Sequence, residues 1–201
     1  MTVTLFYKTT MILYLHGFRS SPRSFKARVV SERMQAMGRG NELICPQLPA
    51  SPKEAMALAL TLVERYPADR LSVIGSSLGG FYATWLAERL GCRAALLNPA
   101  VDPLKDLEKH VGVTTAWHSD EPFEFKREYI DELAALRVAH VTRPERYYLL
   151  AATGDEVLDY RDMVAHYPGA RQHVIEGSDH AISEFPRYVD EVLAFCEVEA
   201  R

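Results

Sequence analysis

Residues 71–80 read LSVIGSSLGG, with two adjacent serines set among glycines directly after an apolar run. The run 71–74 predicts a strand, and LGGFYATWLAERL (78–90) predicts a largely buried helix, because apolar residues cover most of its surface. Between them GSSLG (75–79) matches the pattern G-x-S-x-G, with Ser77 at its centre. A strand before this pattern and a helix after it form the context in which the motif presents a serine hydroxyl at a sharp turn.

The glycines around Ser77 have a steric explanation. On a tight strand-to-helix turn the flanking residues press on one another, so a Cβ atom at Gly75 or Gly79 would clash. Ser76 occupies the variable position of the pattern and lacks glycines at the required spacing. Ser77 is therefore the candidate nucleophile, and the N-terminus of the following helix would place free N–H groups beside its hydroxyl.

The rest of the chain alternates short apolar runs with amphipathic stretches. Near-continuous apolar strands separated by helices imply a parallel sheet that is covered on both faces. We therefore predict a doubly wound α/β fold with about six mostly parallel strands and helices on both faces. Strands are expected at 11–15, 42–45, 71–74, 93–98, 146–152 and 171–176, and helices at 24–37, 53–66, 78–90 and 184–196.

One long stretch, 101–145, interrupts this alternation. It is mixed in charge and holds Trp117, Phe123 and Phe125. Insertions of this length are often functional, so one interpretation is a small cap in which these aromatic side chains line a substrate-binding acyl pocket. The alternative is an excursion with a purely structural role.

A serine hydroxyl is a weak nucleophile, so Ser77 needs a base, and that base needs an acid to orient it. After a G-x-S-x-G turn the chain order is serine, acid, histidine. His180 follows the predicted strand 171–176 and precedes the last helix, at the sheet edge where the turn opens. His173 lies inside that strand and His166 in a predicted helix, so His180 is the candidate base.

The acid is expected in ATGDEVLDY (152–160), directly after a predicted strand. Asp155 comes first after the glycine that marks the end of the strand, so it stays near the sheet edge and is the favoured candidate. Glu156 and Asp159 remain alternatives, and Asp159 could simply cap the helix that follows.

The developing oxyanion needs two N–H donors. One is the amide of Leu78, directly after the nucleophile, and the other should come from the loop after the first strand, LYLHGFRSSP (13–22). Phe18 is the best candidate there, because it follows the glycine that frees the backbone. His16 precedes the serine in the chain, and we interpret it as a local hydrogen-bonding residue that holds this loop.

The charge pattern argues against nucleic acid as a partner. The chain carries 23 basic and 27 acidic side chains, a net charge of −4, and the signs are interspersed. No apolar run approaches the roughly 20 residues of a membrane span, and the opening MTVTLFYKTT lacks the regions of a secretion signal. A length of 201 residues, 48% of them hydrophobic, predicts one domain spanning 1–201.

Cysteine usage and motif spacing predict neither a metal nor a cofactor. Cys45, Cys92 and Cys196 lie far apart, so we interpret them as buried free thiols of a cytoplasmic protein. No H-E-x-x-H motif or Cys/His cluster has the spacing of metal ligands. The segment GSSLGG is not G-x-G-x-x-G, and it lacks the lysine of a phosphate-binding loop.

Six segments from Met11 onward occur together, in order and with fitting spacing: LYLHGF.SSPRS.KA, PQLP, GSSLGGFYATWL, NPAV.P, TGDEVLDYR and VIEGSDHA. Together they resemble the YqiA-type bacterial esterases, a branch of the α/β-hydrolases. The resemblance implies the α/β-hydrolase fold, a triad of Ser77, Asp155 and His180, and hydrolysis of carboxylic esters or acyl thioesters. The segment 113–140 and the ten residues before Met11 depart from the family pattern.

These residues predict a serine hydrolase acting on a small-molecule acyl ester. Ser77 would attack the acyl carbonyl, His180 would take the proton, and Asp155 would fix the imidazole tautomer before water releases the acyl-enzyme. An acyl-CoA thioesterase or an acyltransferase would use the same triad. A non-catalytic binding protein could keep the same fold, but it has no need of three matched groups.

The first ten residues allow two interpretations. TVTLFYKTT (2–10) has a strand-like alternation and could add an edge strand to the sheet. Alternatively it is an upstream extension, because MILYLHGF (11–18) already forms a complete strand-to-loop unit. We favour the extension and expect deletion of 2–10 to leave hydrolysis unchanged and to cost little stability.

Overall fold

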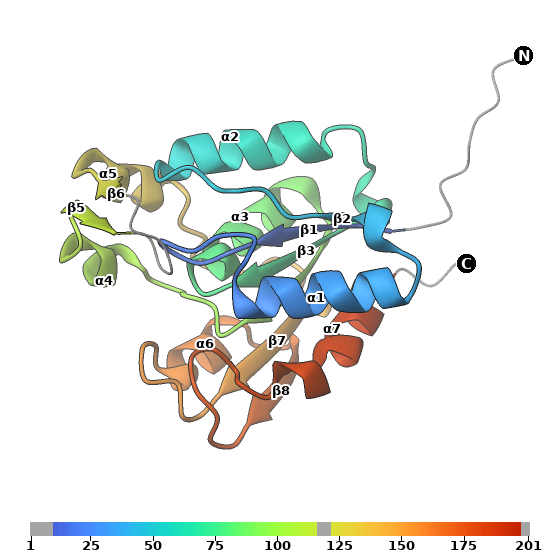
Figure 1. Cartoon of the computed structure of the whole chain (residues 1–201). Coiled ribbons are helices and arrows are strands. Elements are labelled where there is room, and N and C mark those ends of the chain that lie inside the picture. Colours follow the sequence, from blue (N-terminus) through green and yellow to red (C-terminus); the bar gives the residue numbers. More distant parts are fainter. Residues whose placement is uncertain (1–9, 116–121, 198–201) are drawn as a thin grey trace, which may run out of the picture.

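The computed structural model describes residues 10–115 and 122–197, so residues 2–9 of the possible edge strand lie outside the described residues. Helices and strands alternate through these ranges (Figure 1). The strands are β1 (Met11–Leu15), β2 (Leu43–Ile44), β3 (Leu71–Ser76), β4 (Arg93–Leu97), β5 (Gly112–Thr115), β6 (Pro122–Phe125), β7 (Tyr147–Ala152) and β8 (Arg171–Ile175). The α-helices are α1 (Phe25–Ala36), α2 (Pro52–Val63), α3 (Leu78–Leu90), α4 (Leu104–Glu108), α5 (Glu128–Ala135), α6 (Tyr160–His166) and α7 (Val189–Cys196).

Within the described ranges, six strands form one sheet in the order β2-β1-β3-β4-β7-β8, and every neighbouring pair is parallel. One core cluster joins one face of this sheet to α2, α3 and α6, and a second joins the other face to α1 and α7. Figure 1 shows α2 and α1 on opposite sides of the strands. The prediction of a parallel sheet covered on both faces is therefore confirmed.

The apolar runs of the sequence follow from this double burial. In β1, Leu13 and Leu15 enter the cluster with α2 and α3, whereas Ile12 and Tyr14 enter the cluster with α1 and α7. All four side chains are at most 1% exposed. A strand with both faces buried has no solvent-facing side, so the polar alternation of a half-exposed strand is missing.

Parallel pairing brings the carboxyl ends of the strands to one edge of the sheet. Ser76 pairs with Leu97, Leu97 with Leu150, and Ala152 with Ile175, so β3, β4, β7 and β8 end close to the same level. Loops that leave this edge carry the candidate site residues, as expected for an open α/β sheet.

The insertion between β4 and β7 is a small structured unit. It contains α4, the antiparallel hairpin of β5 and β6, and α5. Leu107, Phe125 and Leu133 anchor it in the core cluster that α2 and α3 share. Figure 1 places the unit beyond the end of the sheet toward which β1 and β3 point, which is the edge that carries the candidate site.

Four predicted elements are at least two residues shorter than expected, and a proline explains two of the differences. The helices expected at 24–37 and 53–66 are α1 and α2, of 12 residues each. The strand expected at 42–45 is β2, of two residues, and it stops before Pro46, which has no N–H to donate to a ladder. The helix expected at 184–196 begins only at Val189, because a 3-10 turn at Phe185–Arg187 contains Pro186. No helix in 10–115 or 122–197 is long and apolar enough to cross a bilayer.

Candidate active site

Ser77 stands at the turn from β3 to α3 in a strained backbone conformation, with φ 55° and ψ −122°. Residues with a Cβ rarely adopt a positive φ, and such outliers cluster at functional sites. The flanking glycines are a steric requirement, as predicted. A Cβ atom at Gly75 would overlap the carbonyl of Gly79, and one at Gly79 would overlap the carbonyl of Leu15. Strand, turn and helix can approach this closely only without these side chains.

Hydrogen bonds hold the main chain of Ser77 in place. Its N–H donates to the Leu97 carbonyl at 3.1 Å, and its carbonyl accepts from the amides of Gly80 at 2.8 Å and Ala100 at 3.0 Å. Ser76 is instead the last residue of β3 and is 6% exposed, whereas Ser77 is half-buried. Ser77 is the better placed of the two serines to meet a substrate.

His180 and Asp155 form a hydrogen-bonded pair. His180 Nδ1 lies 2.8 Å from Asp155 Oδ2, and the two side chains are 21% and 0% exposed. The other carboxylate oxygen, Oδ1, accepts from the amides of Val157 at 2.8 Å and Leu158 at 2.9 Å. An ionised carboxylate only accepts, so Nδ1 of a neutral imidazole carries the proton and Nε2 is left as the acceptor.

The two alternative acids have other roles. Asp159 caps α6, because its Oδ1 accepts from the amide of Arg161 at 2.9 Å. Glu156 accepts from the main-chain N–H of His180 at 2.9 Å, so it contacts the loop of the base and not its ring. Of the three candidates, Asp155 is the one that the structure brings to the imidazole.

The other two histidines after residue 150 lie elsewhere. His166 is the last residue of α6, where its ring packs on Tyr167. His173 lies in β8 and bonds through Nδ1 to Glu191 at 2.8 Å. The structure thus supports His180 as the base by position and by partner.

Residues at the end of β4 link the turn that carries Ser77 to the loop after β8 that carries His180. Asn98 Nδ2 donates to the carbonyls of Asp179 at 3.1 Å and His180 at 3.2 Å. Its chain neighbour Leu97 accepts from the Ser77 amide. Within the described part of the chain, Ser77 Oγ and the His180 imidazole share no hydrogen bond, and catalytic contacts of this kind often tighten only with substrate.

The loop after β1 lies against the Ser77 side chain. A Cβ atom on Gly17 would be 3.2 Å from Ser77 Cβ and 3.6 Å from Ser77 Oγ. Phe18 follows in this loop, and Leu78 is the first residue of α3, where the N–H has no partner within the helix. The predicted oxyanion donors therefore come from the two segments that flank the hydroxyl.

His16 holds this loop from within. Its Nε2 accepts from the Leu48 amide at 3.1 Å, and its Nδ1 lies 3.0 Å from the Gly17 carbonyl, so the proton sits on Nδ1. Burial lowers the pKa of His16, which keeps the ring neutral. The interpretation of His16 as a local structural residue is confirmed.

The aromatic residues of the insertion surround Phe18. Its ring lies edge-on to Phe123 and Phe125, with centroids 5.3 and 5.1 Å away, and 5.5 Å from the ring of His110. Phe123 is half-buried, whereas Phe125 is only 1% exposed, so Phe125 supports Phe18 from the core and does not line an open pocket. Trp117 lies outside the described residues.

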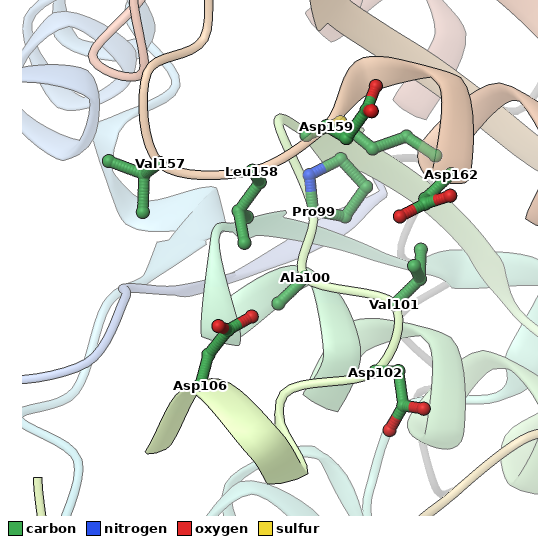
Figure 2. A pocket seen from close by; sticks show the side chains of 10 residues that line it. Pro99, Ala100, Val101, Asp102, Asp106, Val157, Leu158, Asp159 and Asp162 are labelled. Atoms are coloured by element: carbon green, nitrogen blue, oxygen red, sulfur yellow. The ribbon is translucent and has the colours of Figure 1, made fainter. Parts of the chain in front are cut away.

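A small cavity of about 110 Å³ opens beside the serine turn (Figure 2). Figure 2 shows Leu158 and Pro99 at its apolar centre and the carboxylates of Asp159 and Asp162 on one side. Its wall includes Ala100, whose amide bonds to Ser77, so the cavity adjoins the site. Among the described residues, no group of three or more His, Cys, Asp or Glu side chains is arranged to hold a metal ion.

Sequence reasoning missed the role of Asn98. This buried residue has φ 43° and receives the Ala152 amide on Oδ1 at 2.8 Å while donating to the histidine loop. Its position directly after a predicted strand, in the segment NPAV.P, was an available signal. Its partners come from the end of β7 and from the loop after β8, which only the assembled sheet brings together.

The fold matches solved structures over nearly the whole chain. A protein from Agrobacterium vitis S4 has 20% identity and a TM-score of 0.71, with 94% of this chain and 89% of that chain covered. Alpha/beta hydrolase domain-containing protein 10 from mouse has 15% identity, a TM-score of 0.65 and coverage of 92% and 90%. The esterase domain of a Rhodothermus marinus protein has 18% identity, a TM-score of 0.64 and coverage of 92% and 85%. The chain has the α/β-hydrolase fold.

A family model covers most of the sequence as well. The model of the uncharacterised protein family UPF0227 matches residues 11–197. The chain therefore belongs to this family, the YqiA-like family of α/β-hydrolase proteins. The resemblance drawn from its six segments is confirmed.

Proposed function

We propose that the protein is a serine hydrolase that cleaves carboxylic esters, with Ser77 as nucleophile, His180 as base and Asp155 as orienting acid. The observation that carries this proposal is the 2.8 Å contact between His180 Nδ1 and Asp155 Oδ2, at the sheet edge that also bears the strained Ser77. The fold shared with an esterase domain from Rhodothermus marinus supports an ester as the substrate.

The first half of the reaction forms an acyl-enzyme. Ser77 Oγ attacks the acyl carbonyl while His180 Nε2 takes the hydroxyl proton. Asp155 accepts the Nδ1–H bond and stabilises the imidazolium that results. The imidazolium then gives its proton to the leaving alcohol, which completes the acyl-enzyme. In the second half of the reaction, water attacks the acyl-enzyme and the same imidazole acts as base.

The amides of Leu78 and Phe18 would stabilise the oxyanion of each tetrahedral intermediate. Both belong to segments that lie against the Ser77 side chain, and an amide at a helix N-terminus also offers the positive end of the helix dipole. Donors fixed in place before the reaction are effective because they need no reorganisation when the charge develops.

The direct test is covalent labelling with a fluorophosphonate probe, followed by assays on p-nitrophenyl esters and acyl-CoA thioesters. We expect stoichiometric labelling of the folded protein, no labelling after heat denaturation, and faster turnover of esters than of thioesters. A folded protein that stays unlabelled would contradict a serine hydrolase, and turnover of thioesters alone would contradict the ester assignment.

A further inference from the structure

Lys26 is a buried lysine beside the proposed base. It lies in the first turn of α1 and is 7% exposed. Its Nζ donates a hydrogen bond of 2.9 Å to the main-chain carbonyl of His180, a residue 154 positions away in the chain. The contact ties the start of α1 to the loop after β8, and the mechanism above assigns it no role.

The main chain of His180 is held on both sides. Its carbonyl accepts from Lys26 at 2.9 Å and from Asn98 Nδ2 at 3.2 Å, and its N–H donates to Glu156 at 2.9 Å. The imidazole itself bonds to Asp155. With the main chain and Nδ1 both fixed, the direction in which Nε2 points is set by these contacts.

Position 26 is otherwise unfavourable for a cation. Burying an ammonium group is strongly unfavourable, and the first turn of a helix carries the positive end of its dipole. The neighbouring Ala27 and Val30 pack in the core cluster of this face, so an apolar side chain would suit position 26 better. The reason for a lysine at position 26 must therefore lie in the groups that surround its ammonium.

Those groups are three carboxylates around the ammonium. Asp155 and Glu156 face the ammonium from the loop after β7, and Asp179 faces it from the loop after β8. Burial lowers the pKa of Lys26 to about 8, against the opposing effect of these carboxylates, so the side chain is still largely charged at neutral pH. These carboxylates therefore favour the charged form of Lys26, in which its Nζ donates to the His180 carbonyl.

We propose that Lys26 is a positioning residue for His180: it fixes the main-chain carbonyl of the base and thereby the direction in which the imidazole Nε2 points. This inference rests on the proposed function. It assigns a catalytic consequence to a residue of α1 that touches neither the substrate nor the reacting atoms.

The test compares Lys26→Met and Lys26→Gln with wild-type protein, and Lys53→Met, an exposed lysine on α2, is the matched control. We expect kcat for a p-nitrophenyl ester to fall by about tenfold in both variants with little change in KM. The melting temperature should change little, because the loss of one hydrogen bond is offset by the removal of a buried ammonium group.

The outcomes separate this proposal from a merely structural role. Wild-type kcat in both variants would overturn it, and so would a higher KM at unchanged kcat or a joint fall of kcat and melting temperature. Lys26→Gln keeps a polar end of similar size, so it carries the test if the methionine variant misfolds. A wild-type protein that the fluorophosphonate probe does not label would overturn the function itself, and this inference with it.

Discussion

At the residue scale, the candidate nucleophile is itself strained, because Ser77 has a φ of 55°. A positive φ on a serine costs roughly 1–3 kcal/mol and persists only where the surroundings enforce it. Here the enforcement comes from the bonds of its main chain to Leu97, Gly80 and Ala100. Ser76, one residue earlier, continues the regular strand and is buried. Adjacent serines thus differ in backbone conformation and in exposure, which makes them a matched pair for mutation.

Ser77→Ala should reduce kcat by at least about 10³-fold, because the attacking hydroxyl is lost while the fold needs only the backbone at this position. Ser76→Ala should change kcat by no more than a few-fold. Steady-state kinetics on a p-nitrophenyl ester, with circular dichroism to verify folding, measures both. An equal loss in the two variants would contradict the assignment of the nucleophile.

Asp155→Asn should lower kcat by up to about 10⁴-fold, the loss typical when the imidazole is held in the wrong tautomer. Asp159→Asn is the matched control, because asparagine is as good a helix cap as aspartate and the residue lies away from the ring. The measurement is kcat at neutral pH together with the melting temperature of each variant. Equal activity in Asp155→Asn and wild type would show that another acid orients the base.

At the scale of elements, the structure of the insertion between β4 and β7 was the part of the fold least predictable from the sequence. Its aromatic residues suggested a cap, but no local pattern indicated which ring would be buried. Both rings lie on β6 of the hairpin, but Phe123 is half-buried whereas Phe125 is 1% exposed. Both rings contact Phe18, so the insertion meets the loop that would supply an oxyanion donor.

Phe123→Ala should alter the preference for acyl-chain length with a small effect on stability, because the ring is partly open beside the site. Phe125→Ala should destabilise the fold by about 3–5 kcal/mol, the usual effect of removing a buried ring from a core. Hydrolysis of esters from acetate to decanoate and thermal melts distinguish the two. The cap interpretation fails if Phe123→Ala lowers stability as much as Phe125→Ala and leaves the chain-length profile unchanged.

At the scale of the whole molecule, the sheet topology made much of the site predictable. Ser77, Asp155 and His180 each follow a predicted strand, and parallel strands deliver such residues to one edge. Lys26 and Asn98 could not be assigned in this way. Their contacts with His180 join positions 154 and 82 residues apart, and the spacing of residues along the chain does not encode such pairs.

The same topology places residues that only stabilise the fold far from the site. Arg93, the first residue of β4, lies at the sheet edge opposite the site. Its Nη1 donates to the carbonyls of Phe195 at 2.9 Å and Glu197 at 2.8 Å, which holds the end of α7. Arg93→Met should cost about 1–2 kcal/mol, because charged hydrogen bonds to partly exposed carbonyls are lost. For a chain of this size that lowers the melting temperature by roughly 2–8 °C.

The kcat of the folded Arg93→Met protein should stay at the wild-type value. The control Arg28→Met, at an exposed position of α1, should change neither kcat nor the melting temperature. A loss of kcat in Arg93→Met at an unchanged melting temperature would show that the two edges of the sheet are coupled.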